Sequence, residues 1–404
     1  MVRNLSVILS FFLVFEVVFL SLAFRYFKIN KYAIVAIVVF SLISYLFFSY
    51  EVLTYDRAHG AKHSLYWSIG MLVLHFVPKV ITLLFWLISA LLVLLPSNFI
   101  NDGESQERKA FLGKLGLAIA TIPFATILYG IFKGKYNFKV ITQQLEFTDL
   151  PEAFDGLKIL QISDLHSGSF DKPEKIQYAV DLINEQDFDL CLFTGDIVNT
   201  KAEEFIPWID TFKKIKDSTY GKYSVLGNHD YGEYVHWSSR EAKQANFEAI
   251  KGLHKKIDFK LLNNEHVLLK NGEDSIAVVG VENWGKKFKK AGDLHKASEG
   301  LSADQFKVLL SHDPSHWEYE VKDNATNFQL TLSGHTHGFQ FGIEIPGFLK
   351  WSPVQYVYKQ WAGLYEHLDR YIYVNRGFGF HAFPGRVGIW PEITVLELKK
   401  KAVS

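Results

Sequence analysis

"FQLTLSGHTHG", residues 328–338, joins an alternating apolar stretch to two histidines, His335 and His337, that are flanked by Gly334 and Gly338. The alternating residues predict a β-strand, so both histidines lie near its end. Side chains two residues apart in extended backbone point to the same side, and the glycines let the backbone crowd that point or turn sharply beside it. The geometry suits a metal ion, although the motif alone fits two solvated loop histidines equally well.

Short apolar runs of the same kind recur towards the C-terminus and alternate with amphipathic stretches. The predicted strands are 157–163, 188–195, 220–227, 274–281, 306–312, 328–334, 371–377 and 392–398. The predicted helices are 173–186, 203–215 and 239–256. Strands that alternate with helices predict a layered α/β domain over residues 136–404. Residues 339–373 are rich in aromatic side chains and fit neither pattern.

Polar side chains follow five of these predicted strands at the point where each strand ends. They are Asp164 and His166 in "SDLH", Asp196 in "TGDIV", Asn228, His229 and Asp230 in "GNHD", His312 and Asp313 in "SHD", and the two histidines of "GHTH". Ligands of layered α/β folds bind beyond the carboxyl ends of strands. Each residue alone could be a helix cap, a turn residue or a buried histidine. Together they predict one crevice that collects oxygen and imidazole ligands.

The order DxH, GD, GNHD, a histidine after a strand, and GHxH, with roughly 30 residues between the first three motifs, resembles the calcineurin-like metallophosphoesterases. The resemblance covers about residues 150–400. It is strongest to a bacterial branch that ends in "AGLY…YVNRGFG…PGR…PEITVLEL" (362–398) and includes membrane-anchored phosphodiesterases and some lipid A precursor pyrophosphatases. It implies two packed mixed sheets flanked by helices, and a metal-dependent hydrolase of phosphoric ester or pyrophosphate bonds.

The resemblance also implies a role for each polar residue. Asp164, His166 and His337 would bind one metal ion, Asn228, His312 and His335 would bind a second, and Asp196 would bridge the two. Two divalent cations about 3.5–4 Å apart can hold a phosphate and activate water. Mixed nitrogen and oxygen ligands suit Mn²⁺, Fe or Zn²⁺ better than Mg²⁺, and we favour manganese. His229 would face the substrate, to stabilise charge or protonate the leaving oxygen, with Asp230 holding its ring.

Two arginines and an aromatic run complete the candidates. Arg376 and Arg386 could clamp a phosphate, because guanidinium binds phosphate bidentately, but structural salt bridges are an equal alternative. The aromatic side chains could line a path for acyl chains, enter the membrane interface, or pack in the core and loops. They are Phe339, Phe341, Phe348, Trp351, Tyr356, Tyr358 and Trp361.

The first 135 residues predict a polytopic membrane region. Four apolar stretches, about 5–24, 32–50, 71–95 and 111–132, are long enough to cross a hydrocarbon core of ~30 Å. Apolar residues also precede the third stretch, and Pro78 interrupts it. If this longer run splits into two short spans, the region contains five spans instead of four.

Two ionisable residues, Glu16 and Lys79, lie within these apolar stretches. Ionisable groups are costly there and often functional. The alternative is a lysine that snorkels to the surface and a glutamate that is protonated or near the interface.

The charge distribution bears on partners and on membrane topology. Residues 1–135 contain 12 basic and 6 acidic side chains, and the remainder contains 31 and 37. The sequence has no stripe of basic residues, which argues against nucleic acid as a partner. Loop charges conflict, but Arg3 and the lysines after residue 132 favour a cytoplasmic catalytic domain on a bacterial inner membrane. The lone Cys191 excludes an intramolecular disulfide.

The sequence therefore predicts a membrane-bound, dinuclear-metal-dependent phosphohydrolase that cleaves a phosphodiester or pyrophosphate bond. Four spans exceed what an anchor needs, which favours a lipid-linked phosphorylated substrate and membrane lipid as a further partner. One alternative is a phosphodiesterase for soluble substrates, with the helices only as a tether. Another is a membrane transporter or sensor with a phosphoesterase-derived binding module, against which the intact ligand set argues.

Overall fold

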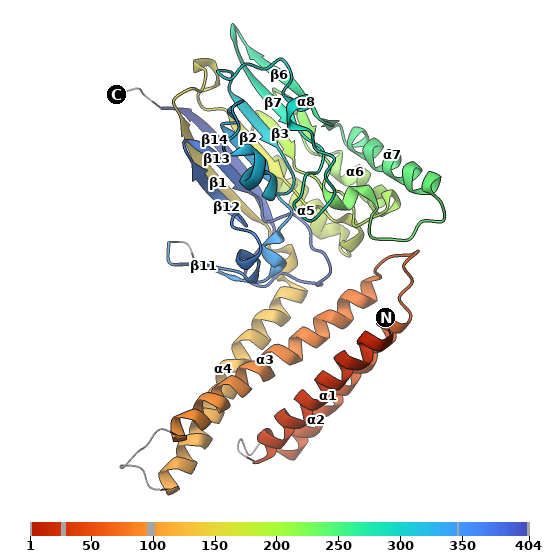
Figure 1. Cartoon of the computed structure of the whole chain (residues 1–404), viewed down its shortest axis with the longest axis vertical. Helices are drawn as coiled ribbons and strands as arrows, with labels where there is room; N and C mark the ends of the chain where they lie inside the picture. The colour runs from red at the N-terminus through yellow and green to blue at the C-terminus, as the bar shows by residue number, and fades with distance from the viewer. Residues whose placement is uncertain (1, 26–29, 95–101, 346, 402–404) are drawn as a thin grey trace. The chain divides into compact units, whose positions relative to one another are not determined.

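The computed structural model describes residues 2–25, 30–94, 102–345 and 347–401. Contacts divide the chain into two compact units (Figure 1). The first contains the residues up to 56, 61–132 and 382–385, and the second contains 57–60, 133–381 and 386–404. Every strand among the described residues lies in the second unit.

Four long helices form the first unit: α1 (Val2–Arg25), α2 (Lys31–Leu53), α3 (His63–Leu94) and α4 (Asp102–Phe132). A helix satisfies its own backbone hydrogen bonds, which a lipid environment requires. Within the described ranges, three helices are long and apolar enough to cross a membrane, and the apolar part of α1, Ile8–Phe24, is shorter. Because α3 continues through Pro78 as one helix, the third apolar stretch does not split into two spans.

The two ionisable residues of the apolar stretches meet in this unit. Lys79 Nζ lies 2.7 Å from Oε1 and 2.8 Å from Oε2 of Glu16, and 2.6 Å from Oγ of Ser41. All three side chains are buried. Lys79 therefore does not snorkel: it pairs with Glu16, and the pairing reduces the cost of holding each charge among apolar helices.

Two six-stranded mixed sheets form the second unit, in the orders β1-β14-β2-β3-β4-β5 and β12-β13-β9-β8-β7-β6. Adjacent parallel strands occupy the middle of each sheet: β2 (Lys158–Ile162), β3 (Leu190–Phe193) and β4 (Lys222–Ser224) in the first, and β7 (Asp274–Gly280), β8 (Lys307–Leu310) and β9 (Leu330–Ser333) in the second. The other strands are β1 (Lys139–Phe147), β5 (Lys260–Leu261), β6 (Glu265–Asn271), β12 (Gly363–His367), β13 (Arg370–Val374) and β14 (Glu392–Lys400).

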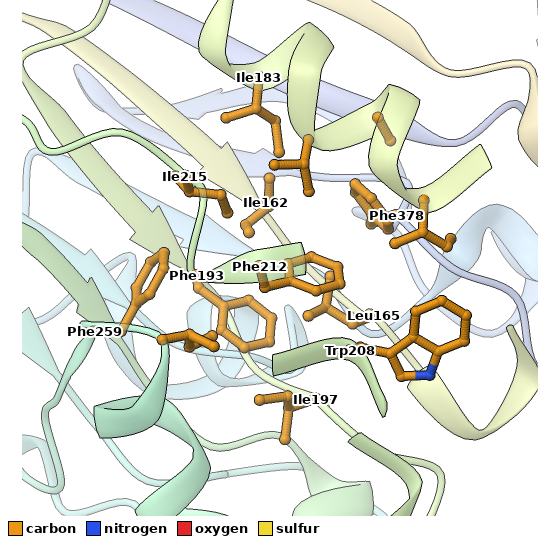
Figure 2. Close-up of a cluster of buried hydrophobic side chains, with 14 of the residues drawn as sticks. Ile162, Leu165, Ile183, Phe193, Ile197, Trp208, Phe212, Ile215, Phe259 and Phe378 are labelled. Atoms are coloured by element: carbon orange, nitrogen blue, oxygen red, sulfur yellow. The ribbon is translucent and has the colours of Figure 1, made fainter. Parts of the chain in front are cut away.

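The sheets pack face to face over an apolar core and are covered on their outer faces. Ile159 and Leu192 of the first sheet share one buried cluster with Val308 and Leu330 of the second. A second cluster packs helices α5 (Pro173–Asn184), α6 (Ile209–Phe212) and α7 (Arg240–Lys256) on the first sheet; Ile183 of α5, Phe193 of β3 and Phe212 of α6 belong to it (Figure 2). Burial on both faces explains why the central strands read as continuous apolar runs. The predicted fold of two packed mixed sheets with flanking helices is confirmed.

Two local predictions differ from the structure. The helix predicted over 203–215 is a 3₁₀ segment, Ala202–Trp208, followed by the short α6, because Pro207 interrupts the α-helical hydrogen bonds. The unassigned stretch after the histidine motif contains β12 and a separate two-stranded hairpin of β10 (Ile343–Ile345) and β11 (Leu349–Trp351).

Candidate metal centre

Five loops at the carboxyl ends of β2, β3, β4, β8 and β9 bring the predicted His and Asp residues together. Among the described residues there are three groups of three side chains, and within each group the possible ligand atoms lie within 4.8 Å of one another. They are Asp164, His166 and His337; His166, Asp196 and His229; and Asp196, His312 and His335. The groups share His166 and Asp196, so they form one continuous centre.

Atoms of three loops define one half of this centre. His337 Nε2 lies 3.2 Å from Asp164 Oδ1, and His166 Nε2 lies 3.5 Å from Asp196 Oδ2. Apart from this contact with Asp164, the buried Nε2 atom of His337 has no hydrogen-bond partner in the part of the chain that is described. Carboxylate oxygens and imidazole nitrogens thus face a common point, which is the donor set that a divalent metal requires.

The other half contains a second set of nitrogen and oxygen donors. His312 Nε2 lies 3.1 Å from Asp196 Oδ2 and 3.3 Å from His335 Nδ1. Asn228 Oδ1 lies 2.7 Å from the same Nδ1 atom. Asp196 Oδ2 therefore faces imidazoles of both halves.

The backbone at this centre is strained. Five of the seven predicted ligands have left-handed φ angles: Asp164 (54°), His166 (47°), Asp196 (60°), His335 (70°) and His337 (49°). Non-glycine residues rarely adopt this region, at a cost on the order of 1–3 kcal/mol each, and such residues cluster at functional sites. Gly334 lets the backbone pass close to Asp164, because a Cβ at this position would lie 2.2 Å from Asp164 Oδ2.

Outer partners orient the imidazole rings. His312 Nδ1 faces the carbonyl oxygen of Thr194 at 2.7 Å, and His166 Nδ1 lies 3.2 Å from Asn199 Oδ1. His335 Nε2 lies 2.8 Å from the hydroxyl of Tyr358. Each contact fixes one ring nitrogen and leaves the other directed at the centre, as in metal sites where an outer hydrogen bond orients the ligand.

The predicted pairing of His229 with Asp230 is wrong. His229 Nδ1 faces the carbonyl oxygen of Asn199 at 2.7 Å. The Asp230 carboxylate instead accepts hydrogen bonds from the backbone N–H groups of Asp196 (3.0 Å), Ile197 (3.0 Å) and Gly227 (2.8 Å). In the tight "GNHD" turn the carboxylate folds back onto the chain, so Asp230 supports the loop that carries Asp196.

Burial and neighbouring charge shift the pKa values of these groups. Burial lowers the pKa of His166, and the imidazoles of His229 and His381 lower it further. Burial also lowers the pKa of His312, but Asp196 and Asp164 outweigh this and raise it to about 10. The two carboxylates therefore stabilise positive charge at the point where the groups meet, which fits a cation.

The two candidate clamp arginines have protein partners. Arg376 pairs with Glu392 through Nη1 at 2.5 Å and with Glu344 through Nε at 2.9 Å. Arg386 is buried and donates to the carbonyl oxygens of Gly379 and Arg376, at 2.8 Å each. These contacts favour the structural alternative over a phosphate clamp, because the planar donors of both groups are already used.

Sequence reasoning missed several residues around the centre. They are Asn199, Tyr234 and His381, together with Tyr358, which the sequence places in the aromatic run and not at the centre. Tyr234 accepts a hydrogen bond from Asn228 Nδ2 at 2.6 Å, and the ring of His381 lies 4.6 Å from that of His229. Asn199, three residues after Asp196, could have been found from its place in the same strand-end loop. The other three follow no spacing rule, since tertiary folding alone brings them here.

Comparisons with known proteins agree with this geometry. Residues 2–135 match the family model of a probable calcineurin-like phosphoesterase transmembrane domain, and residues 157–339 match the calcineurin-like phosphoesterase model. The chain is 31% identical to the uncharacterized metallophosphoesterase YkuE of Bacillus subtilis over 62% of this chain and 82% of that protein. YkoQ of the same organism, an uncharacterized metallophosphoesterase, is 27% identical over 69% and 97%.

A further relative matches a larger share of the chain. A transmembrane protein with metallophosphoesterase domain from Danio rerio is 26% identical over 75% of this chain and 67% of that protein. Two mixed sheets, a centre of clustered histidines and aspartates, and apolar helices that can cross a membrane therefore agree with the relatives and the family models. The chain belongs to the calcineurin-like metallophosphoesterases and is a membrane protein of that family.

Proposed function

We propose that this hydrolase cleaves a phosphodiester or pyrophosphate bond with two divalent metal ions. Asp164, His166 and His337 would hold one ion, Asn228, His312 and His335 would hold the other, and Asp196 would be shared between them. The observation that carries the proposal is the position of Asp196 Oδ2, 3.5 Å from His166 Nε2 and 3.1 Å from His312 Nε2. When bound, such ions act as Lewis acids towards phosphate and water, and manganese fits the mixed donors.

The chain's own residues hold these ligands and position a proton. A carbonyl oxygen can only accept, so the Asn199 carbonyl fixes the proton of His229 on Nδ1. His229 shares a group with His166 and Asp196, and because Nδ1 is taken by the carbonyl, Nε2 is the nitrogen left for a phosphate oxygen. To act as an acid His229 must carry a second proton, on Nε2; the cationic ring then stabilises charge on the phosphate or delivers the Nε2 proton to the leaving oxygen, and it remains neutral with its Nδ1 proton on the Asn199 carbonyl.

The substrate in this proposal is lipid-linked and phosphorylated. The support is the membrane-spanning unit, which has more apolar helices than a tether requires. We further propose that the catalytic domain lies on the cytoplasmic side of a bacterial inner membrane, from Arg3 and from the lysines directly after α4, Lys133, Lys135 and Lys139. Fusions of a fluorescent protein and of alkaline phosphatase at Ser404 test the side: fluorescence without phosphatase activity supports it, and the reverse pattern contradicts it.

Metal content and hydrolysis of bis(p-nitrophenyl) phosphate test the reaction. The full chain in lipid nanodiscs should contain two metal ions, lose activity in a chelator, and recover most activity with Mn²⁺. Asp196→Asn should lower the content of both ions and abolish turnover. Asp304→Asn, a matched change at an exposed aspartate, should alter neither. Full turnover by Asp196→Asn, or by the metal-free protein, would contradict the proposal.

The lipid-linked substrate requires a separate comparison. A diphosphate lipid in vesicles should be hydrolysed with a higher kcat/KM than a water-soluble diester that has the same leaving group. Equal values would indicate that the helices only tether a phosphodiesterase for soluble substrates.

A further inference from the structure

The β10–β11 hairpin is oriented with its apolar face outwards. Its register pairs Ile343 with Trp351, Glu344 with Lys350 and Ile345 with Leu349. Alternate residues of a strand point to opposite faces, so Ile343, Ile345, Leu349 and Trp351 share one face. Glu344 and Lys350 share the other. The hairpin belongs to neither six-stranded sheet, and Figure 1 shows β11 apart from them.

The charged face of the hairpin is the one that contacts the phosphoesterase domain. Glu344 accepts from Arg376 Nε at 2.9 Å. Lys350 Nζ donates to the carbonyl oxygen of Ala362 and lies 5.0 Å from the ring centre of the buried Trp361. These contacts fix which face points inwards. A soluble hairpin normally shows the reverse arrangement, with its apolar side chains on the core.

The outward face exposes large apolar side chains. Exposed fractions are 48% for Ile343, 49% for Ile345 and 41% for Leu349, and Phe348 at the turn reaches 83%. Single exposed apolar residues are ordinary, but a contiguous group marks an interaction site. We call Ile343, Ile345, Phe348 and Leu349 the apolar hairpin face.

The chain itself indicates what covers this face. The last residue of α4, Phe132, is seven residues before the first residue of β1, Lys139. Seven residues span at most ~25 Å, so a bilayer that holds α4 lies within this distance of the start of the phosphoesterase domain. Lipid is therefore an apolar environment that the short connection to α4 keeps near the phosphoesterase domain.

We infer that the apolar hairpin face inserts into the interfacial layer of the bilayer that holds the helices. Trp351 on the same face fits this location, because tryptophan favours the membrane interface. The hairpin also connects to the metal centre: Ser352 Oγ donates to the carbonyl oxygen of Gly338 at 2.7 Å, directly after His337. Insertion would thus hold the metal loop at the lipid surface.

A single-cysteine experiment tests the insertion. Cys191 is buried, and burial raises the pKa of its thiol to about 12, so it does not react with thiol reagents. Ile345→Cys and Phe348→Cys can therefore be labelled selectively with the fluorophore NBD in the full chain. Leu268→Cys, on β6 and 45% exposed, is the matched control at an apolar surface position.

The labelled proteins are reconstituted in phosphatidylcholine–phosphatidylglycerol nanodiscs, with and without lipids that carry a nitroxide on the acyl chain. The labels at 345 and 348 should lose at least half of their fluorescence to the nitroxide lipids and resist aqueous iodide, whereas the label at 268 should show the opposite pattern. Iodide quenching at 345 and 348 equal to that at 268 would overturn the inference. Shielding from both quenchers would also overturn it, because protein such as a second copy would then cover the face. Neither readout depends on turnover.

Discussion

Nδ1 of His229 lies 2.7 Å from the backbone carbonyl oxygen of Asn199. The ring is therefore oriented by main chain from the loop after β3, the same loop that carries Asp196. Asp230 supports this loop by accepting hydrogen bonds from the backbone N–H groups of Asp196 and Ile197. The two neighbouring residues of "GNHD" thus have different contacts, and in the proposed mechanism they have different tasks: His229 would face the substrate, and Asp230 would hold the loop that carries Asp196.

This division of tasks predicts different phenotypes for two adjacent substitutions. His229→Ala should lower kcat by about 10²–10⁴, the usual contribution of a positioned acid or base, without changing the metal content. Asp230→Ala should lower the metal content, because Asp196 loses the carboxylate that holds its backbone N–H. Steady-state kinetics and elemental analysis of the same preparations check both. Loss of metal from His229→Ala would instead indicate that His229 is a metal ligand.

The buried pair of Arg376 and Glu392 makes a second prediction. Glu392 is fully buried and accepts from Arg376 Nη1 at 2.5 Å. Arg376→Gln would leave this carboxylate without its cation, and breaking a buried pair typically costs ~3–5 kcal/mol. We expect a clearly lower Tm in differential scanning calorimetry and an unchanged KM in the surviving folded enzyme. Arg240→Gln, at an exposed arginine, is the control. A raised KM with an unchanged Tm would contradict this and would support Arg376 as a phosphate-binding residue.

The sequence predicted which residues meet at the candidate centre because each follows a strand end within a short motif, so local structure alone positions Asp164, Asp196 or His335. It placed Tyr358 in the aromatic run but missed its contact with His335, because this residue reaches His335 through a loop whose path depends on tertiary contacts. The hairpin shows a related limit. Alternation indicates that Ile343 and Ile345 share a face, but only the contacts of Glu344 with Arg376 show which face turns outwards.

The ion pair inside the membrane unit makes a third prediction. Lys79→Met should leave the Glu16 carboxylate, among the described residues, with the hydroxyls of Ser41 and Tyr45, which donate at 3.0 and 3.1 Å. We expect this to lower stability by ~3–5 kcal/mol. The double variant Glu16→Gln/Lys79→Met removes both charges and should recover more than half of the loss. The Tm of the full chain in nanodiscs measures both. Lys114→Met, at an exposed lysine of α4, should have little effect. A double variant no more stable than Lys79→Met would mean that the pair is not the source of the stability.

The last prediction concerns His254, which lies fully buried near the end of α7. Neither ring nitrogen has a hydrogen-bond partner among the described residues, and the ring stacks on Phe193 with centroids 5.6 Å apart. Burial lowers the pKa of His254 from 6.5 to about 3. In the unfolded chain this histidine takes up a proton below about pH 6.5, which the folded protein resists. Folding therefore loses stability as the pH falls from 6.5 towards 3, by at most ~5 kcal/mol for the full shift.

His254→Phe should remove this part of the pH dependence. The phenylalanine fills a similar volume and needs no hydrogen bond, so the variant should melt at a higher temperature than the wild type at pH 5 and by a smaller margin at pH 8. Calorimetry of the phosphoesterase domain transition in the full chain, at both pH values, gives the two margins. His295→Phe is the control, because it replaces an exposed histidine. A margin that does not grow between pH 8 and pH 5 would show that His254 is not held neutral by burial.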